Sequence, residues 1–138
     1  PSGFIEFQTL FSKKKSAEAF SRLILLSQSH SRQSWICGVK RHKSDSSYLS
    51  FSGDGLSITM NFPLNNFKKL DREKYSEKLL DTILEFDGKV YLSKHSFLTK
   101  WAFQKMYPEY KKILELKTKY DPEQLFYSDA TKRLLIDS

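Results

Sequence analysis

The sequence predicts an α+β fold: a ferredoxin-like antiparallel sheet with two helices on one face, followed by a helical C-terminal tail. The first observation behind this prediction is the order of patterns in residues 1–92, which reads strand, helix, strand, strand, helix, strand. The second is the clean alternation of apolar and polar residues over 56–62, which is typical of a half-buried strand. The third is that residues 93–138 contain only helical patterns. We therefore expect 1–138 to form a single domain, with its ferredoxin-like core in 1–92 and a helical tail in 93–138.

The first elements follow from residue type and spacing. Phe4 to Phe11 is rich in Phe and Ile, which indicates a strand. We expect Ser16 to cap the next helix, because apolar residues follow it at helical spacing, and we expect that helix to end near Ser29. Trp35 to Arg41 is predicted as the second strand, and Tyr48 to Phe51 as a short extended segment.

The third strand has the clearest pattern in the chain. Gly53-Asp54-Gly55 is a turn signal, residues 56–62 alternate, and Pro63 ends the strand. Asp71 is expected to cap a helix that runs to Phe86. The side chains expected in the core between strand and helix are Ile58, Met60, Leu79 and Ile83.

The end of the core and the tail are predicted from caps and breakers. Leu70 and Tyr75 have the spacing of a hydrophobic staple, Gly88 stops the helix, and Lys89 to Leu92 is predicted as the last strand. The tail is expected to contain three helices: Phe97 to Met106, Glu109 to Lys119 opened by Pro108, and Asp129 to Leu135 capped by Ser128.

Length and composition are those of a folded domain. Of the 138 residues, 39% are hydrophobic and 28% are charged, which is enough for a full core. No apolar run approaches the ~18 residues that cross a bilayer. The single cysteine, Cys37, excludes an internal disulfide and a Cys-based zinc site, so a cytoplasmic location is expected. Cys37 itself, flanked by Trp35 and Val39, is expected to be buried.

The net charge of +7 leaves two interpretations open. A basic balance attracts anionic partners such as nucleic acid, phosphorylated substrates or an acidic membrane face, but surface lysines can also simply keep a domain soluble. A ferredoxin-like domain that binds RNA carries an aromatic RNP1 pattern on a central strand, and neither 35–41 nor 56–62 resembles it. No nucleic-acid partner is therefore expected.

Several catalytic motifs are absent from the sequence. It contains no GxGxxG, GxxxxGK[ST], HExxH or GxSxG pattern. The histidines, His30, His42 and His95, are far apart in polar loop contexts and are interpreted as surface residues. We expect no metal site.

The functional prediction depends on a family resemblance in residues 87–135. They contain D-G-K-V-Y-L-S-K-H-S, then F-Q-K-M-Y-P-E-Y, then D-P-E-Q-L-F-Y-S-D-A-T-K-R-L. In order and spacing these segments resemble the C-terminal end of FAD-linked oxidases of the vanillyl-alcohol-oxidase class, in particular the bacterial decaprenylphosphoryl-ribose oxidase-like oxidoreductases. Phe4 to Gln8, Val39-Lys40 and Gly55 to Pro63 resemble earlier strands of that family.

The resemblance implies an FAD cofactor, held mostly by a separate N-terminal domain of the same polypeptide, over which this domain closes as a substrate cap. It implies that Lys94 is the catalytic residue that contacts flavin and substrate, and that Tyr91 binds the cofactor beside the ring. The positions that match the family's substrate-binding residues are Gln8, Lys40, Ser57 and Thr59.

Some of these positions depart from the family pattern. Glu6 stands where the family has glutamine, Ser57 and Thr59 where it has asparagine and cysteine, and His95 where it has aspartate. These departures bear on the substrate rather than on the flavin chemistry. Pro1-Ser2-Gly3 leads straight into a strand without an initiator methionine, so we expect an N-terminal part that precedes it.

The first hypothesis is a domain of an FAD-dependent oxidoreductase that oxidises an alcohol carbon (CH–OH) of a sugar, sugar-phosphate or sugar-lipid by hydride transfer to FAD. The 138-residue chain alone is expected to be inactive. The whole protein is expected to be cytoplasmic, with peripheral contact to the inner membrane. The alternatives are a sugar-lactone or alditol oxidase of the same class, and a stand-alone basic ferredoxin-like module that binds nucleic acid or a regulatory ligand.

Overall fold

The computed structural model of the chain describes residues 3–31, 33–63, 69–94, 97–126 and 128–135. Its elements are, in order, β1 (Phe4–Ser12), α1 (Lys13–Ser29), β2 (Ile36–His42), β3 (Gly55–Pro63), α2 (Lys69–Glu85), β4 (Lys89–Val90), the 3-10 turn η2 (Leu92–Lys94), α3 (Lys100–Met106), α4 (Tyr110–Tyr120) and α5 (Asp129–Leu134). The predicted α+β class with a helical C-terminal tail is confirmed.

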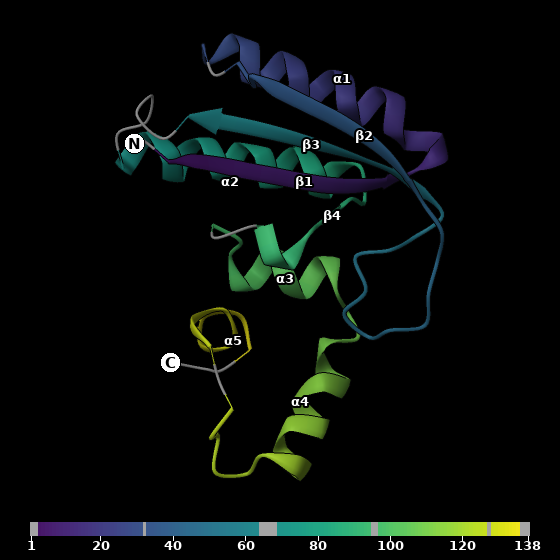
Figure 1. The fold of residues 1–138 in the computed structure, drawn as a ribbon, viewed down its shortest axis with the longest axis vertical. Helices are drawn as coiled ribbons and strands as arrows, with labels where there is room; N and C mark the ends of the chain where they lie inside the picture. The colour runs from purple at the N-terminus through teal and green to yellow at the C-terminus, as the bar shows by residue number, and fades with distance from the viewer. Residues whose placement is uncertain (1–2, 32, 64–68, 95–96, 127, 136–138) are drawn as a thin grey trace.

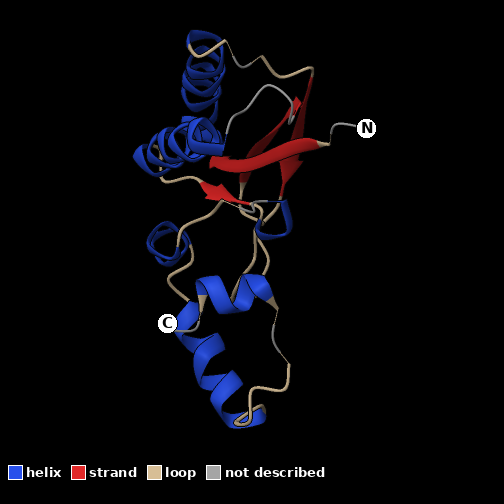
Figure 2. Cartoon of the chain, turned by 90° about the vertical axis from the view of Figure 1, so that its left-hand side faces the viewer, coloured by secondary structure: helices blue, strands red, loops and turns tan. Residues whose placement is uncertain are grey.

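The four strands form one antiparallel sheet in the order β2-β3-β1-β4. The two long strands β1 and β3 pair along their whole length, from Phe4 opposite Pro63 to Ser12 opposite Gly55. This order, with the first strand between the third and the fourth, is that of the split β-α-β unit. Figure 1 and Figure 2 show α1 and α2 together on one face of the sheet, as the sequence predicts.

The core lies between this face and the two helices. Ile58 and Met60 of β3 and Leu79 and Ile83 of α2 are all buried, which confirms the predicted core residues. The alternation on β1 is read directly from the register: Phe7 pairs with Met60, so both side chains point to the same face, toward the helices. The opposite face of the sheet carries the residues in between.

The beginning of the tail is part of the same core. Leu98, Ala102, Phe103 and Met106, on or next to α3, are buried in one cluster with the side chains of α2 and the sheet. The outer part of the tail is different, since α4 contains no buried residue. In Figure 1, α4 extends away from the sheet below α3.

The helices α1 and α2 both begin before the residue that was predicted to cap them, and the Ser12 side chain, which precedes α1, makes no capping hydrogen bond. The helix α1 begins at Lys13, and Ser16 is buried inside its first turns, where its hydroxyl donates to the Lys13 carbonyl at 3.0 Å. Asp71 lies in the first turn of α2 rather than before it. The predicted contact of Leu70 with Tyr75 falls on a side chain outside the described residues.

Extended segments are also shorter than predicted. Tyr48–Phe51 forms no strand, and β4 ends at Val90 because the chain turns into η2. The helix α3 begins at Lys100 rather than Phe97, because the Thr99 hydroxyl accepts a hydrogen bond from the Ala102 amide at 3.2 Å and caps it there. The predicted cap of α5 is confirmed: the Ser128 hydroxyl accepts from the Thr131 amide at 3.2 Å.

The prediction that Cys37 is buried is wrong. Cys37 lies opposite Met60 on the helix side of β2, yet it is exposed, and its neighbours Trp35 and Val39 are 64% and 59% exposed. The reason is topological, because β2 is an edge strand and the two helices cover the middle of the sheet more than this edge. Apolar residue type alone does not reveal which strand is at the edge.

Candidate functional site

The candidate site is the sheet surface that faces away from α1 and α2, called here the helix-free face. Strand alternation and the register decide which side chains it carries. Its residues are Glu6, Gln8 and Leu10 of β1, Ser57, Thr59 and Asn61 of β3, Ile36, Gly38, Lys40 and His42 of β2, and Tyr91 directly after β4.

The four predicted substrate-binding residues lie on this face as neighbours in the register. Gln8 is opposite Thr59 across β1 and β3, and Lys40 is opposite Ser57 across β2 and β3. Gln8 and Ser57 are buried, with Ser57 at 0% exposure, whereas Lys40 is exposed. The polar side chains therefore form the floor of the face, and the lysine ammonium is available to solvent or a ligand.

The two predicted flavin-contacting residues lie at the β4 side of the same face. The Tyr91 amide donates to the Gln8 carbonyl at 2.8 Å, which holds Tyr91 beside the middle of β1. The Lys94 amide donates to the Tyr91 carbonyl at 3.0 Å and closes the 3-10 turn. This turn brings the Lys94 ammonium within 3.5 Å of the Glu6 carboxylate, with the two side chains 44% and 21% exposed.

The loop between β2 and β3 crosses one end of the helix-free face. The Phe51 ring lies 5.4 Å from the His42 ring and 5.1 Å from the Tyr91 ring, measured between centroids. Phe51 thus connects the outer strand β2 with the segment after β4. The same loop reaches the tail, since the Lys112 ammonium is 5.2 Å from the centre of the Tyr48 ring. Figure 1 shows this long loop beside the start of α4.

His42 is a site residue that the sequence reasoning missed. The prediction placed it in a polar loop, but it is the last residue of β2, is half-buried, and its Nε2 lies 2.8 Å from the Ser57 hydroxyl oxygen. Its position two residues after Lys40 on a strand was the available signal, because such residues share a face. Phe51 carried no comparable signal, since it lies in a loop without periodicity.

The environment of His42 favours its neutral form. Loss of hydration lowers the pKa of His42 below its ordinary value, and the positive charges of Lys40 and Arg41 lower it further. A neutral imidazole can accept a hydrogen bond from the Ser57 hydroxyl or donate one to it, depending on the tautomer. The end of the face next to Phe51 is therefore polar without carrying a histidine charge near pH 7.

The middle of the face contains an unmet hydrogen-bonding group. The Thr59 hydroxyl oxygen has less than 1 Å² of accessible surface and no hydrogen-bond partner among the described residues. Buried hydroxyls are normally hydrogen-bonded, because an unsatisfied one costs free energy. Thr59 is thus an unsatisfied polar group in the sheet, and its oxygen is closed to solvent in this conformation. Within the described part of the chain, no three His, Cys, Asp or Glu side chains are grouped as metal ligands.

The residues present suit the ring of a flavin better than its nucleotide. Lys94 and Tyr91 offer a cation and an aromatic side chain at the edge of the face. A pyrophosphate is usually held by a glycine-rich turn at a helix N-terminus, and the five glycines of this sequence form no such motif. A cation and an aromatic side chain fit the ring of a flavin, whereas the sequence contains no glycine-rich motif for its phosphates.

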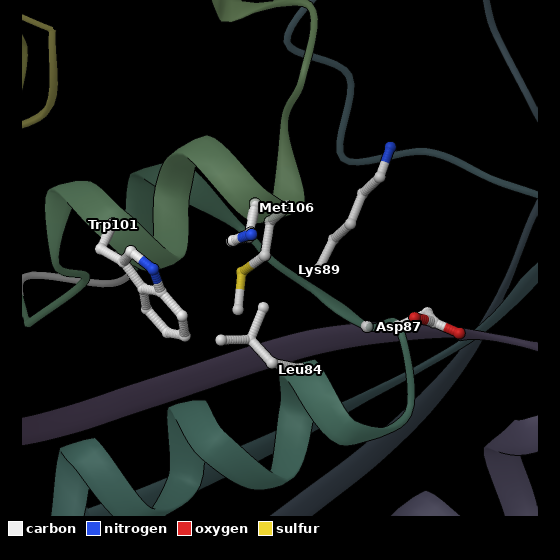
Figure 3. Close-up of a pocket in the computed structure, with 7 residues that line it drawn as sticks. Leu84, Asp87, Lys89, Trp101 and Met106 are labelled. Atoms are coloured by element: carbon white, nitrogen blue, oxygen red, sulfur yellow. The ribbon is translucent and has the colours of Figure 1, made fainter.

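A hollow elsewhere on the molecule is a weaker candidate. It has a volume of about 280 Å³, lies between α2, β4 and α3, and contains none of the predicted site residues. Figure 3 shows Trp101 beside Leu84 and Met106, with Asp87 and Lys89 on the other side. These charged groups already have partners, because Asp87 pairs with Lys15 and the Lys89 ammonium lies 5.4 Å from the Tyr107 ring centre.

Comparison with known proteins decides the family. The family model for D-arabinono-1,4-lactone oxidase matches residues 12–134, which is most of the chain. The chain belongs to the D-arabinono-1,4-lactone oxidase family. This membership confirms the resemblance to FAD-linked oxidases and makes the chain an oxidoreductase domain rather than an unrelated ferredoxin-like module.

One curated relative supports the same assignment. The chain is 27% identical over 134 residues to decaprenylphosphoryl-beta-D-ribose oxidase of Mycolicibacterium smegmatis. The alignment covers 96% of this chain but 28% of that protein, so the chain spans less than a third of the length of its relative. In the described part of this family member, no helix is both long enough and apolar enough to span a membrane.

Proposed function

We propose that this chain is the substrate-binding domain of a flavin-dependent oxidase that converts a CH–OH carbon of a sugar-type substrate to a carbonyl group. The observation that carries the proposal is the helix-free face. There Gln8, Lys40, Ser57 and Thr59 share one face of the sheet with Tyr91 and Lys94, which lie at its β4 side, although these residues are spread over most of the sequence. Membership of an oxidase family supports the same class of reaction.

In this proposal Lys94 supplies the charge that the chemistry needs. FAD would supply the acceptor for the hydride of the alcohol carbon, the hydroxyl proton would be released to solvent, and Lys94 would lie near the part of the ring, N1 and C2=O, where a reduced flavin is negatively charged. An ammonium about 4 Å from such a charge contributes roughly 4 kcal/mol at an effective dielectric constant of about 20, before its desolvation is subtracted. Lys94 is 44% exposed and is paired with Glu6, so part of this energy is screened.

The other residues of the face hold and orient the substrate. Gln8, Ser57 and Thr59 make the floor of this face neutral and polar beneath a sugar-type substrate, and Ser57, which is 0% exposed and hydrogen-bonded to His42, would position that imidazole rather than touch the substrate. Lys40 is exposed at the outer strand, where its ammonium can bind a phosphate or another anionic part of the substrate. Tyr91, fixed against Gln8 and Phe51, limits the space beside the flavin ring.

The proposed partner is an FAD-binding domain of the same polypeptide. The chain covers 28% of the length of the M. smegmatis oxidase, which leaves ample length in such a protein for a nucleotide-binding domain. That domain would hold the FAD phosphates and lie against the helix-free face. We propose that the whole protein acts in the cytoplasm, in peripheral contact with the inner membrane if its substrate is a sugar-lipid.

A sugar-lactone substrate is the second candidate. The family match favours it, because the family is named after D-arabinono-1,4-lactone oxidase, whose name refers to a sugar lactone. The name of the M. smegmatis relative refers instead to a prenylphosphorylated ribose. The two candidates differ in charge, so Lys40→Ala should weaken binding of a phosphorylated substrate and leave binding of a neutral lactone nearly unchanged.

The test uses the full-length protein that contains this chain, loaded with FAD and mixed anaerobically with D-arabinono-1,4-lactone or decaprenylphosphoryl-β-D-ribose. Loss of flavin absorbance in a stopped-flow instrument reports the reduction. Lys94→Ala should slow it on the order of 10²–10³-fold, while the melting temperature stays close to that of the unmodified protein. Lys14→Ala, at an exposed position on α1, is the matched control and should change neither quantity. Reduction at a normal rate in Lys94→Ala would contradict the proposal.

A further inference from the structure

A glycine occupies the centre of the edge strand on the helix-free face. Gly38 lies opposite Thr59 in the register, and Thr59 in turn lies opposite Gln8. Lys40 follows on the same face two residues later. Gly38 therefore lies next to the proposed substrate-binding residues. It is the position in this row across the sheet, Gly38–Thr59–Gln8, that has no side chain.

Nothing in the fold itself requires glycine at this position. Among the described residues, no glycine has a positive φ angle, so the backbone of Gly38 is one that any residue can adopt. A Cβ atom added to Gly38 would meet no other atom within 4 Å. The contrast with Gly55 is clear, because a Cβ there would come 2.0 Å from the Phe11 carbonyl oxygen.

A glycine inside a strand is unfavourable unless something needs the space. It loses more conformational freedom on folding than other residues do, and it has no side chain to pack against its neighbours. In strands, such a glycine often marks a place where a ligand or another backbone comes close to the sheet. No described atom comes within 4 Å of a Cβ built on Gly38, so the space beside this glycine is open to a group from outside the described residues.

We propose that Gly38 is a specificity-determining residue that lets the sugar ring of the substrate lie directly on the sheet backbone. This inference rests on the proposed function and extends it to the shape of the substrate site. The face of a sugar ring consists of C–H groups that can contact the Gly38 Cα, while its hydroxyls project from the rim. A ring in this place has Thr59 and then Gln8 beside it across the sheet, and the exposed Lys40 ammonium along the strand.

The inference predicts opposite effects on stability and on binding. Gly38→Ala and Gly38→Val add a methyl and an isopropyl group into empty space in the free protein, so both variants should fold. Their melting temperatures should equal or exceed that of the unmodified protein, because alanine and valine suit a strand better than glycine. The same groups would occupy the volume of the sugar ring. A change of this size in a binding pocket alters discrimination by roughly 10–200-fold.

The experiment compares these variants in the full-length, FAD-loaded protein. Binding of D-arabinono-1,4-lactone and decaprenylphosphoryl-β-D-ribose is measured from the change in flavin absorbance or from the thermal shift, and KM and kcat from flavin reduction. Gly38→Val should raise Kd and KM at least tenfold. Gly38→Ala should give Kd and KM values between those of the unmodified protein and those of Gly38→Val, and the FAD content of both variants should stay unchanged. Cys37→Val is the matched control, because it places the same valine side chain on the same strand but on the other face, and it should leave Kd and KM unchanged.

The outcomes separate this inference from the proposed function. If both Gly38 variants bind the probes as well as the unmodified protein does, the inference is overturned, even if Lys94→Ala slows flavin reduction. If the Gly38 variants lose FAD or change oligomeric state instead, the space above Gly38 belongs to another protein segment and the inference is again wrong. If the unmodified protein binds a probe in a Gly38-dependent way but does not reduce its flavin, the binding site stands and the proposed reaction fails. If neither probe binds to the unmodified protein, both proposals fail.

Discussion

The hydroxyl of Tyr107 donates a 2.5 Å hydrogen bond to the carbonyl oxygen of Val90. It joins the end of α3 to the short strand β4, although the two residues are 17 positions apart. The Tyr107 side chain is 1% exposed, and burial raises the pKa of its phenol, so it remains a neutral donor at all ordinary pH values. Tyr91 and Lys94 follow directly after β4. The helical tail therefore supports the edge of the sheet that presents these two residues.

Tyr107→Phe is expected to lower the free energy of unfolding by about 1–3 kcal/mol. The phenylalanine ring fills nearly the same volume, but the buried Val90 carbonyl loses its partner. Urea unfolding followed by tryptophan fluorescence measures the change. The control is Tyr120→Phe, because the Tyr120 side chain is 71% exposed and its loss should stay within about 0.5 kcal/mol. Equal stabilities of the two variants would contradict the supporting role of Tyr107.

Ile83 connects α2 to the sheet and is 0% exposed. Ile83→Ala is expected to lower the free energy of unfolding by roughly 2–5 kcal/mol, because it removes buried methyl groups and leaves a cavity in a closely packed core. The comparison is Leu116→Ala on α4, where the side chain is 41% exposed and the cost should be much smaller. If both substitutions cost the same in denaturant unfolding, α2 does not pack on the sheet as described.

The order of elements and most of the core could be predicted from the sequence. Alternating apolar residues at 56–62 and helical spacing in α2 are direct consequences of burying one face of a strand or helix. They predicted Ile58, Met60, Leu79 and Ile83 correctly. Element ends were less predictable, because a serine near the start of a helix can bond to a carbonyl within the helix instead of capping it. Ser12 precedes α1, while the predicted cap Ser16 bonds within the helix.

The candidate site was predictable only where strands determine it. Side chains alternate between the two faces along a strand, so once β1 and β3 are known to pair, Gln8 and Thr59 must lie on the same face. The exposure of Cys37 depends on which strand lies at the edge, and that is a property of the whole sheet. The contact of Phe51 with His42 depends on the path of a long loop, which no local pattern specifies. Lys94 was singled out by family resemblance, since its own sequence context resembles that of any surface lysine.

The 138-residue chain by itself is expected to bind FAD weakly. It offers Lys94 and Tyr91 to the flavin ring but has no glycine-rich turn for the pyrophosphate, which provides much of the affinity in dinucleotide-binding proteins. Titration of the purified chain with FAD, followed by the quenching of flavin fluorescence, measures the affinity. The full-length protein is the positive control. Submicromolar binding to the isolated chain would show that the cofactor domain has been assigned to the wrong part of the protein.

Glu6 is expected to lower the redox potential of the flavin in the full-length protein. Its carboxylate lies 3.5 Å from the Lys94 ammonium and offsets part of the positive charge that favours reduction. Glu6→Gln keeps the shape and removes the charge, so the midpoint potential should rise. A partly exposed ion pair is worth about 0.2–1 kcal/mol, which corresponds to roughly 5–20 mV for a two-electron couple. Glu18→Gln on the exposed side of α1 should leave the potential unchanged, and a fall in potential for Glu6→Gln would contradict the proposed position of Lys94.

His42 should make the stability of the domain depend on pH just below neutrality. Its pKa in the folded protein is lowered by burial first and by Lys40 and Arg41 next, so between this value and about 6.5 the unfolded chain binds more protons than the folded one. Stability therefore rises with pH through that window and is lost as the pH falls through it. Above about pH 7 both states hold a neutral imidazole, and the contribution of His42 no longer changes.

The variant His42→Gln removes this titration while keeping a side chain that can hydrogen-bond to the Ser57 hydroxyl. Urea unfolding at a series of pH values from 5 to 8 should give a smaller loss of stability toward acid pH for the variant than for the unmodified chain. The carboxyl groups of Asp45, Asp54 and Asp121 do not confuse the comparison, because their lowered pKa values place their effects in a more acidic range and both proteins contain them. Parallel curves for the two proteins would mean that His42 is as well hydrated in the folded state as in the unfolded chain. The Phe51 loop would then not cover this end of the helix-free face in solution.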